Sequence, residues 1–204
     1  MPRKARPATR PRLSRQAREN RILDAAERLF YPRGVHRVGM DELVREADLG
    51  KATVYRLYPT KDALIGAYLQ RLSDRILALV DADIAAHEDD AAAAIRAIFT
   101  AIAEDVSRAD FRGCPFNNAS IEFDDPDHPA RVVSREYRAA LRDRLQELAR
   151  QVRPGSDGDR LGDQLALLVD GMYLSAAHLG AVGPAASAPA LLDQLLPATR
   201  RRRR

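Results

Sequence analysis

Residues 39–61 read GMDELVREADLGKATVYRLYPTK, and this stretch decides the fold. The apolar residues of its first half follow the i, i+3, i+4, i+7 spacing of one helix face, and they are Met40, Leu43, Val44 and Ala47. The tripeptide at 48–50 interrupts this pattern, and a second short helix is predicted over 51–57 with Gly50 as its N-cap. The stretch therefore predicts two short helices joined by a tight turn.

The second short helix has one apolar and one polar face. Val54 and Leu57 are predicted to point inward, which leaves the outward face to Lys51, Thr53, Tyr55 and Arg56. Such side chains donate hydrogen bonds to phosphate oxygens and reach base edges, and a helix N-terminus adds N–H groups and a positive dipole end. A helix-turn-helix that binds DNA is the expected motif, although spacing alone also fits two short helices of an ordinary bundle.

A third helix is predicted upstream, from Arg15 to Tyr31, where Pro32 is expected to stop or kink it. Its apolar face carries Ile22, Leu23, Ala26, Leu29 and Phe30. Downstream, Thr60 is the predicted N-cap of the next helix. Residues 14–60 are thus predicted to form a small three-helix domain.

Several segments of this domain resemble the DNA-binding domain of the tetracycline-repressor (TetR) family over about residues 15–68. They are RILDAAERLF at 21–30, Gly34, KATVY at 51–55, Tyr58, Lys61 and Leu64. The resemblance implies that Lys51, Thr53, Tyr55, Tyr58 and Lys61 hold and read DNA. Ala52 stands where the family has Gly or another small residue, and Arg56 and Gly39 complete the predicted DNA-binding set.

Four positions depart from the family pattern. One is Pro32, near the end of the upstream helix, where it cannot donate a backbone hydrogen bond. Asp48 replaces the usual turn glycine, where a left-handed backbone is often needed. Gly50 replaces a Ser or Thr N-cap and removes one potential phosphate donor. Gly39, at the start of the first short helix, also lacks the hydroxyl that many relatives have there.

Charge is divided unevenly along the chain. Residues 1–61 hold 15 Lys or Arg against 7 Asp or Glu, residues 62–199 hold 13 against 22, and the last five residues are all Arg. The basic part contains the helix-turn-helix, as expected for a surface that binds nucleic acid. Residues 1–13 are predicted to be a disordered basic arm that could also reach along a duplex, and residues 199–204, including Arg200–Arg204, a solvated basic tail.

Composition excludes several classes of protein. The single Cys114 excludes an internal disulfide framework and a multi-cysteine metal site, and no cofactor or metal is expected. No apolar run approaches the length of a membrane span, and the basic start lacks the apolar segment of a signal peptide. A cytoplasmic protein is therefore expected.

The remainder, residues 61–198, is predicted to be a helical regulatory and dimerisation domain, so the fold class is all-α. Helices are expected over 60–86, 91–108, 129–152, 159–180 and 187–196, with a short one starting at Pro115. The last two helices are apolar enough to form a homodimer as a four-helix bundle, an interface that the resemblance also implies. The predicted interface residues are Leu161, Leu165, Leu168, Met172, Leu191, Leu192 and Leu195. Small residues at 171, 175, 177 and 180 would allow close helix approach, and the alternative is that both helices complete the core of one chain.

The resemblance further implies a small-molecule pocket among these helices. Its candidate residues mix apolar and aromatic side chains with a few polar atoms, and they are Phe99, Phe111, Phe116, Asn117, Phe123, Tyr137, Met172, Tyr173 and His178. Each of them taken alone is more often a core residue, and His178 on an apolar face is expected to be a core histidine. Cys114, in a Gly-Cys turn found in some family members, is either a thiol sensor or a small buried hydrophobe.

The sequence leaves two rival functions open. Residues 122–128 hold four carboxylates and His128, enough for a helical enzyme, although the two prolines favour a solvated acidic loop. The second rival is a basic protein that binds DNA without sequence preference. The favoured interpretation is a dimeric transcriptional regulator and not an enzyme: a repressor that binds a palindromic operator and is released by a small apolar or aromatic effector. An activator on the same fold is the alternative.

Overall fold

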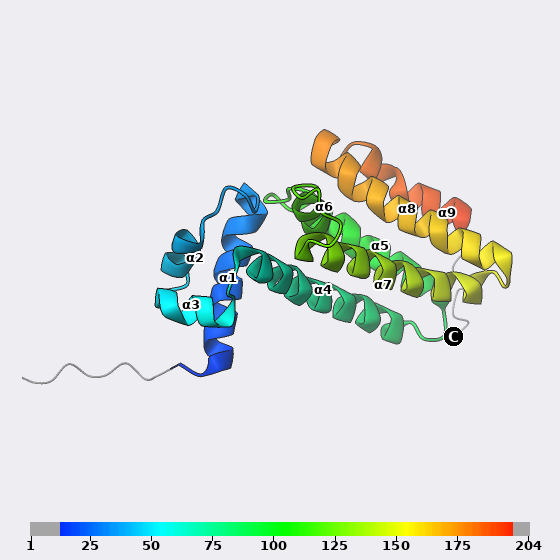
Figure 1. Cartoon of the computed structure of the whole chain (residues 1–204). Helices are drawn as coiled ribbons and strands as arrows, with labels where there is room; N and C mark the ends of the chain where they lie inside the picture. The colour runs from blue at the N-terminus through cyan, green and yellow to red at the C-terminus, as the bar shows by residue number, and fades with distance from the viewer. Residues whose placement is uncertain (1–12, 198–204) are drawn as a thin grey trace, which may run out of the picture.

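The computed structural model describes residues 13–197, and in this range the secondary structure is entirely helical (Figure 1). The elements are α1 (Arg15–Arg33), α2 (Met40–Glu46), α3 (Lys51–Leu57), α4 (Lys61–Ala86), α5 (Ala91–Val106), α6 (Pro115–Ser120), α7 (Pro129–Val152), α8 (Ser156–Leu179), the 3-10 helix η1 (Pro184–Ser187) and α9 (Ala188–Leu195). None of these helices combines the length and the apolar character needed to cross a membrane. The predicted arm and tail lie outside the described residues, apart from Leu13.

Several helix boundaries differ by a few residues from those predicted. Helix α1 passes through Pro32 to Arg33, and the amide of Gly34 closes it with a hydrogen bond to the Phe30 carbonyl of 2.8 Å. Because Pro32 lies in the last turn, its missing N–H costs one hydrogen bond and the helix does not stop at Tyr31. Helix α8 begins at Ser156, inside the segment predicted to be a break, and η1 was not predicted.

Helices α1 to α3 form a small domain, here called the head, around the start of α4. Ile22, Leu43, Val54 and Leu64 have no exposed surface and bring the four helices onto one core. Burying such side chains is worth about 1.5–3 kcal/mol each. Thr60 is confirmed as the N-cap of α4, because its hydroxyl accepts a hydrogen bond of 3.0 Å from the Ala63 amide.

Helix α4 connects the head to the body, which comprises α4 to α9 (Figure 1). Its N-terminal half packs on α1 and its C-terminal half lies along α7. Arg71 of α4 pairs with Asp24 and Glu27 of α1 at 2.7 and 3.1 Å. A displacement of α4 would therefore be passed on directly to α1 and the head.

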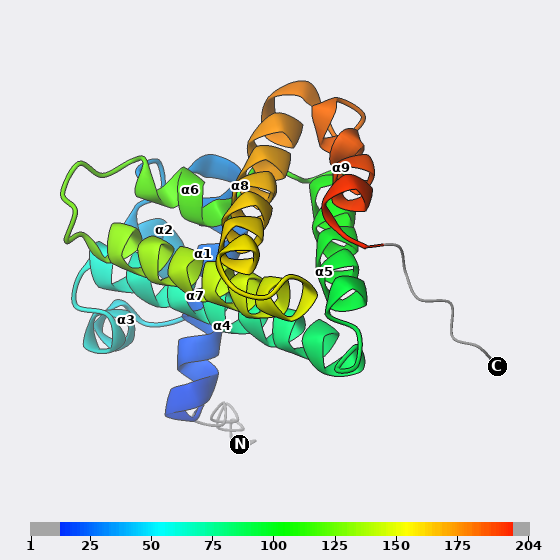
Figure 2. The ribbon, with the colours of Figure 1, turned by 90° about the vertical axis from the view of Figure 1, so that its right-hand side faces the viewer.

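Helices α7 and α8 pack closely, and Figure 2 shows them crossing on one side of the body. The approach depends on Gly162, where an added Cβ would lie 2.5 Å from Cγ and 2.7 Å from Cα of Gln146. The small residues expected to allow the approach of a second helix lie elsewhere on α8: Gly171, Ala177 and Gly180 are exposed and Ser175 is partly exposed. The face of α8 that packs within the chain is its apolar face, where Leu161, Leu165 and Met172 are buried.

Candidate nucleic-acid interface and ligand cavity

The turn between α2 and α3 has the conformation expected of a helix-turn-helix. Asp48 has a φ of 50°, in the left-handed region, and its carboxylate lies 3.5 Å from a guanidinium nitrogen of Arg21 on α1. Gly50 is the N-cap of α3, as predicted, with a φ of −69° that any residue can adopt. The turn thus places the N-terminus of α3 at the surface of the head.

The outer face of α3 carries the side chains predicted to contact DNA. Lys51 and Tyr55 are both exposed, and the Lys51 ammonium lies 5.9 Å from the centre of the Tyr55 ring. Lys51 also pairs with Asp41 of α2 at 2.7 Å, and the hydrogen bond to Asp41 raises the pKa of Lys51. Lys51 is therefore a permanent cation held at the start of α3, where a phosphate could take the place of Asp41.

The other predicted contact residues are at or near the same surface. Ala52, Arg56 and Gly39 are exposed, whereas Thr53, Tyr58 and Lys61 are partly exposed. Burial lowers the pKa of Lys61, with the charges of Asp62 and Glu122 acting in the opposite direction. These residues belong to α3, the turn that follows it, the N-cap of α2 and the first turn of α4.

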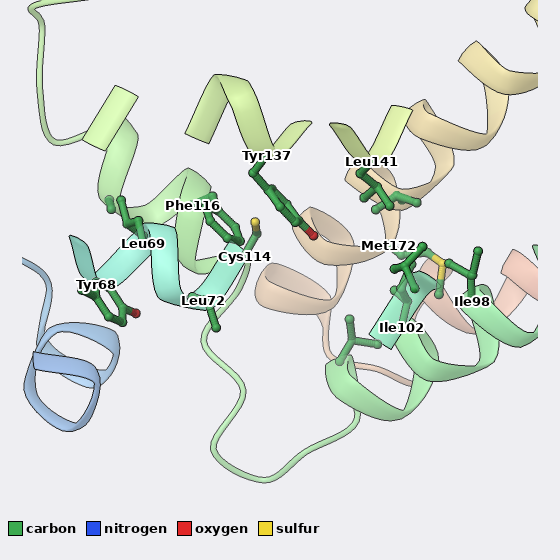
Figure 3. Packing of buried hydrophobic residues seen from close by; sticks show 14 of the residues in the cluster. Tyr68, Leu69, Leu72, Ile98, Ile102, Cys114, Phe116, Tyr137, Leu141 and Met172 are labelled. Atoms are coloured by element: carbon green, nitrogen blue, oxygen red, sulfur yellow. The ribbon is translucent and has the colours of Figure 1, made fainter. Parts of the chain in front are cut away.

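A cavity of about 840 Å³ lies between α1 of the head and α4, α5, α6, α7 and α8 of the body. Three of the predicted pocket residues line it, and they are Phe116, Tyr137 and Tyr173. The rings of Phe116 and Tyr137 stack with their centres 3.8 Å apart, and the Tyr173 hydroxyl donates a hydrogen bond of 3.0 Å to Asp105. Burial raises the pKa of both tyrosines, so their hydroxyls remain protonated. We call this space the main cavity; Figure 3 shows part of its wall, with Tyr137 between Cys114 and Leu141.

The other six predicted pocket residues do not line the main cavity. Phe99 and Met172 are buried in the core, and His178 is exposed on α8, so the expectation of a core histidine is wrong. Phe123 stacks on His128 with ring centres 3.5 Å apart, and the amide oxygen of Asn117 accepts a hydrogen bond from Arg138. Phe111 only approaches the outer side of Tyr173, with 6.0 Å between ring centres.

The part of the wall that α1 and α4 supply was not predicted from the sequence. Tyr31 of α1 and Tyr68 and Leu72 of α4 line the main cavity, so a ligand there would touch the head and the connecting helix directly. The apolar stripe of α4 was visible in the sequence, but its periodicity does not say which residues face a cavity. Cys114 also lines the cavity, and burial raises the pKa of its thiol, which favours the interpretation as a small buried hydrophobe.

Hydrogen bonds join the head to loops of the body. The Tyr31 hydroxyl accepts a bond of 2.8 Å from the Arg112 amide and donates one of 3.2 Å to the Gly113 carbonyl. The Glu122 carboxylate accepts bonds of 3.1 and 3.0 Å from the amides of Val35 and His36. Glu122 of the acidic loop is thus part of the contact between head and body, and among residues 13–197 no cluster of His, Cys, Asp and Glu is arranged to hold a metal ion.

The predicted dimer residues divide between the core and the surface. Leu161, Leu165, Met172 and Leu192 are buried within the chain and cannot form an outer surface, because they face the neighbouring helices of the body. Leu168 and Leu195 are partly buried, and Leu191 is 43% exposed. The large apolar side chains exposed on α8 are instead Leu167 at 73%, Leu174 at 60% and Leu179 at 64%.

Comparison with known proteins identifies the family. Residues 22–68 match a family model described as "Bacterial regulatory proteins, tetR family". In the crystal structure of a TetR-family transcriptional regulator from Streptomyces coelicolor, the aligned chain is 33% identical, with a TM-score of 0.78 over 88% of this chain and 93% of that one.

Two curated relatives agree with this assignment. An uncharacterized HTH-type transcriptional regulator of Mycobacterium tuberculosis is 44% identical over 57 residues, which are 28% of each chain. The transcriptional repressor ComR of Escherichia coli is 29% identical over 161 residues, 76% of this chain and 77% of that one. The matches cover both the helix-turn-helix and the helical body, and the chain therefore belongs to the TetR family of helix-turn-helix transcriptional regulators.

Proposed function

We propose that the protein is a transcriptional repressor that binds a near-palindromic DNA site as a homodimer and leaves it when a small apolar or aromatic effector binds. The observation that carries the proposal is the exposed N-terminal face of α3, with Lys51 and Tyr55 outward on a head built around Val54. A helix N-terminus with this composition fits the major groove and its phosphates. Repression is favoured over activation because ComR, which aligns over most of the chain, is named as a repressor.

The dimer surface proposed here is the stripe Leu167, Gly171, Leu174 and His178 of α8, continued by Leu191 of α9. Its members on α8 follow the i, i+3 and i+4 spacing of one helix face, and all of them are exposed. At Gly171 an added Cβ would meet nothing within 4 Å, which leaves room for a second helix to approach. Two copies joined here would form the four-helix bundle of α8 and α9.

The proposed effector site is the main cavity. Its volume of about 840 Å³ suits a drug-sized molecule, and its wall combines Phe116 and Leu141 with the hydroxyls of Tyr137 and Tyr173. Because Tyr31 and Tyr68 belong to the same wall, an occupant would bear on both α1 and α4. A change of their relative position would alter the spacing of the two α3 helices in a dimer.

Selection of bound sequences from a random duplex pool tests the proposed DNA recognition. The expected product is an inverted repeat whose half-sites lie about one or more helical turns apart, roughly 34 Å per turn. Transcription from a promoter that carries the selected site should fall when the protein is added. Recovery of unrelated sequences would contradict site-specific binding, and increased transcription would assign the protein as an activator.

A further inference from the structure

A second pocket, separate from the main cavity, lies where head and body meet. It has a volume of about 350 Å³ and is lined from the head by Gly34 and Arg37 and from the body by Arg112, Asn118 and Glu122. We call it the junction pocket. Tyr31 and Tyr68 line both spaces, so the two rings lie between the junction pocket and the main cavity.

Arg112 of the junction pocket differs from the other arginines of the body. Between residues 62 and 197, each arginine except Arg112 has a side-chain hydrogen bond or ion pair with a carboxylate or a backbone carbonyl. The guanidinium of Arg112 has no such partner among the described residues, and neither has that of Arg37, which comes from the α1–α2 loop. Both residues are exposed, so two cations without a protein counterion line one pocket.

The remaining polar groups of the pocket compensate this positive charge only in part, which leaves an excess of positive charge. Arg33, Arg37 and Arg112 line it together with a single carboxylate, that of Glu122. The two amide hydrogen bonds from Val35 and His36 already engage that carboxylate, and Arg33 pairs with Glu42 outside the pocket. Asn118 donates a hydrogen bond of 2.8 Å to the Arg112 carbonyl, which fixes the wall of the pocket on the body side.

We propose that the junction pocket binds a small dianion, a molecule with two carboxylates or a phosphate, between Arg37 of the head and Arg112 of the body. Guanidinium groups bind carboxylate and phosphate through paired, charge-assisted hydrogen bonds, and a dianion can engage one from each domain. The site is distinct from the main cavity, which suits an apolar molecule. The proposal does not depend on the identity of the effector or of the operator.

NMR titration of the isotope-labelled full chain tests the proposal, with inorganic phosphate, succinate and acetate as probes at constant ionic strength. Phosphate and succinate are expected to shift the backbone amides of Gly34, Arg112 and Gly113, and acetate to bind at least several-fold more weakly. Arg37→Gln and Arg112→Gln should each weaken phosphate binding about tenfold, as expected for the loss of a charge-assisted contact. Arg45→Gln is the matched control, since Arg45 is exposed on α2 and does not line the pocket.

Three results would overturn the proposal. Shifts confined to the α3 amides of Ala52 and Thr53 would mean that phosphate binds only at the DNA-binding face. Equal weakening by Arg45→Gln would mean that the basic head attracts anions without a specific site. Equal binding of acetate and the two dianions would exclude a ligand that bridges Arg37 and Arg112.

Discussion

At the residue scale, the left-handed backbone of Asp48 is the sharpest local constraint in the helix-turn-helix. At a φ of 50°, a side chain branched at Cβ meets the following carbonyl, whereas Asp and Asn tolerate this region. Asp48→Val is therefore expected to lower the free energy of unfolding by about 1–2 kcal/mol. Chemical denaturation followed by circular dichroism measures the change.

Asp48→Asn separates this backbone effect from charge. It removes the carboxylate that faces Arg21 but keeps a residue that adopts positive φ. Its free energy of unfolding should stay within about 0.5 kcal/mol of the parent value. A loss as large as that of Asp48→Val would show that the carboxylate, not the backbone conformation, is what the turn requires.

A second prediction at this scale follows from the pKa of Cys114. Burial raises the pKa of the thiol above its ordinary value, so at any given pH near neutrality a smaller fraction is thiolate than in an unfolded chain. Iodoacetamide should alkylate the folded protein at pH 8 much more slowly than the urea-unfolded protein, with the rate rising towards alkaline pH. A folded rate that already equals the unfolded rate at pH 7 would revive the interpretation of Cys114 as a thiol sensor.

At the element scale, much of the helix pattern could be predicted because its signals are local. Caps at Thr60 and Gly50 and the prolines at 115 and 129 act on their own first turns, and they mark helix starts correctly. The rotation of each helix about its axis is not local. The rotation of α8 places Met172 and Leu161 in the core and Leu167 and Leu174 at the surface. The broad apolar face of α8 in the sequence does not reveal this distinction.

A substitution at Gly162 of α8 tests how closely α7 and α8 pack. Gly162→Ala would bring its Cβ within 2.7 Å of the Gln146 Cα, a backbone atom that cannot move aside cheaply. We expect a loss of about 1–3 kcal/mol in the free energy of unfolding, the usual cost of overpacking. Ala139→Ser, which also adds one heavy atom but at an exposed position of α7, should change it by less than about 0.5 kcal/mol. Equal effects of the two substitutions would refute the close approach at Gly162.

At the scale of the whole molecule, the proposed function requires a dimer that forms through α8 and α9. Leu174→Glu places a charge in the proposed interface, where burial of an unpaired carboxylate is costly. Light scattering should give the mass of two chains for the parent and of one chain, 22.6 kDa, for the variant. Leu79→Glu, at an equally exposed leucine of α4, is the control and should leave the dimer intact. A dimeric Leu174→Glu protein would place the interface elsewhere.

How the two domains meet could not be predicted from the sequence. Residues 122–128 were interpreted from their composition, whereas the role of Glu122 depends on the amides of Val35 and His36, far away in the chain. The main cavity likewise combines Tyr31 with Tyr137 and Tyr173, three residues that no local rule connects. Both features arise only when helices distant in sequence pack against each other.

Binding to the selected duplex tests whether the face of α3 reads DNA. Fluorescence anisotropy would compare the parent with Lys51→Ala and Tyr55→Ala. The control is Arg160→Ala in the body, which removes one positive charge, as Lys51→Ala does. We predict that each α3 variant binds at least about tenfold more weakly while Arg160→Ala binds like the parent. Unchanged affinity of Lys51→Ala and Tyr55→Ala, with their helical circular dichroism intact, would show that the face of α3 does not read DNA.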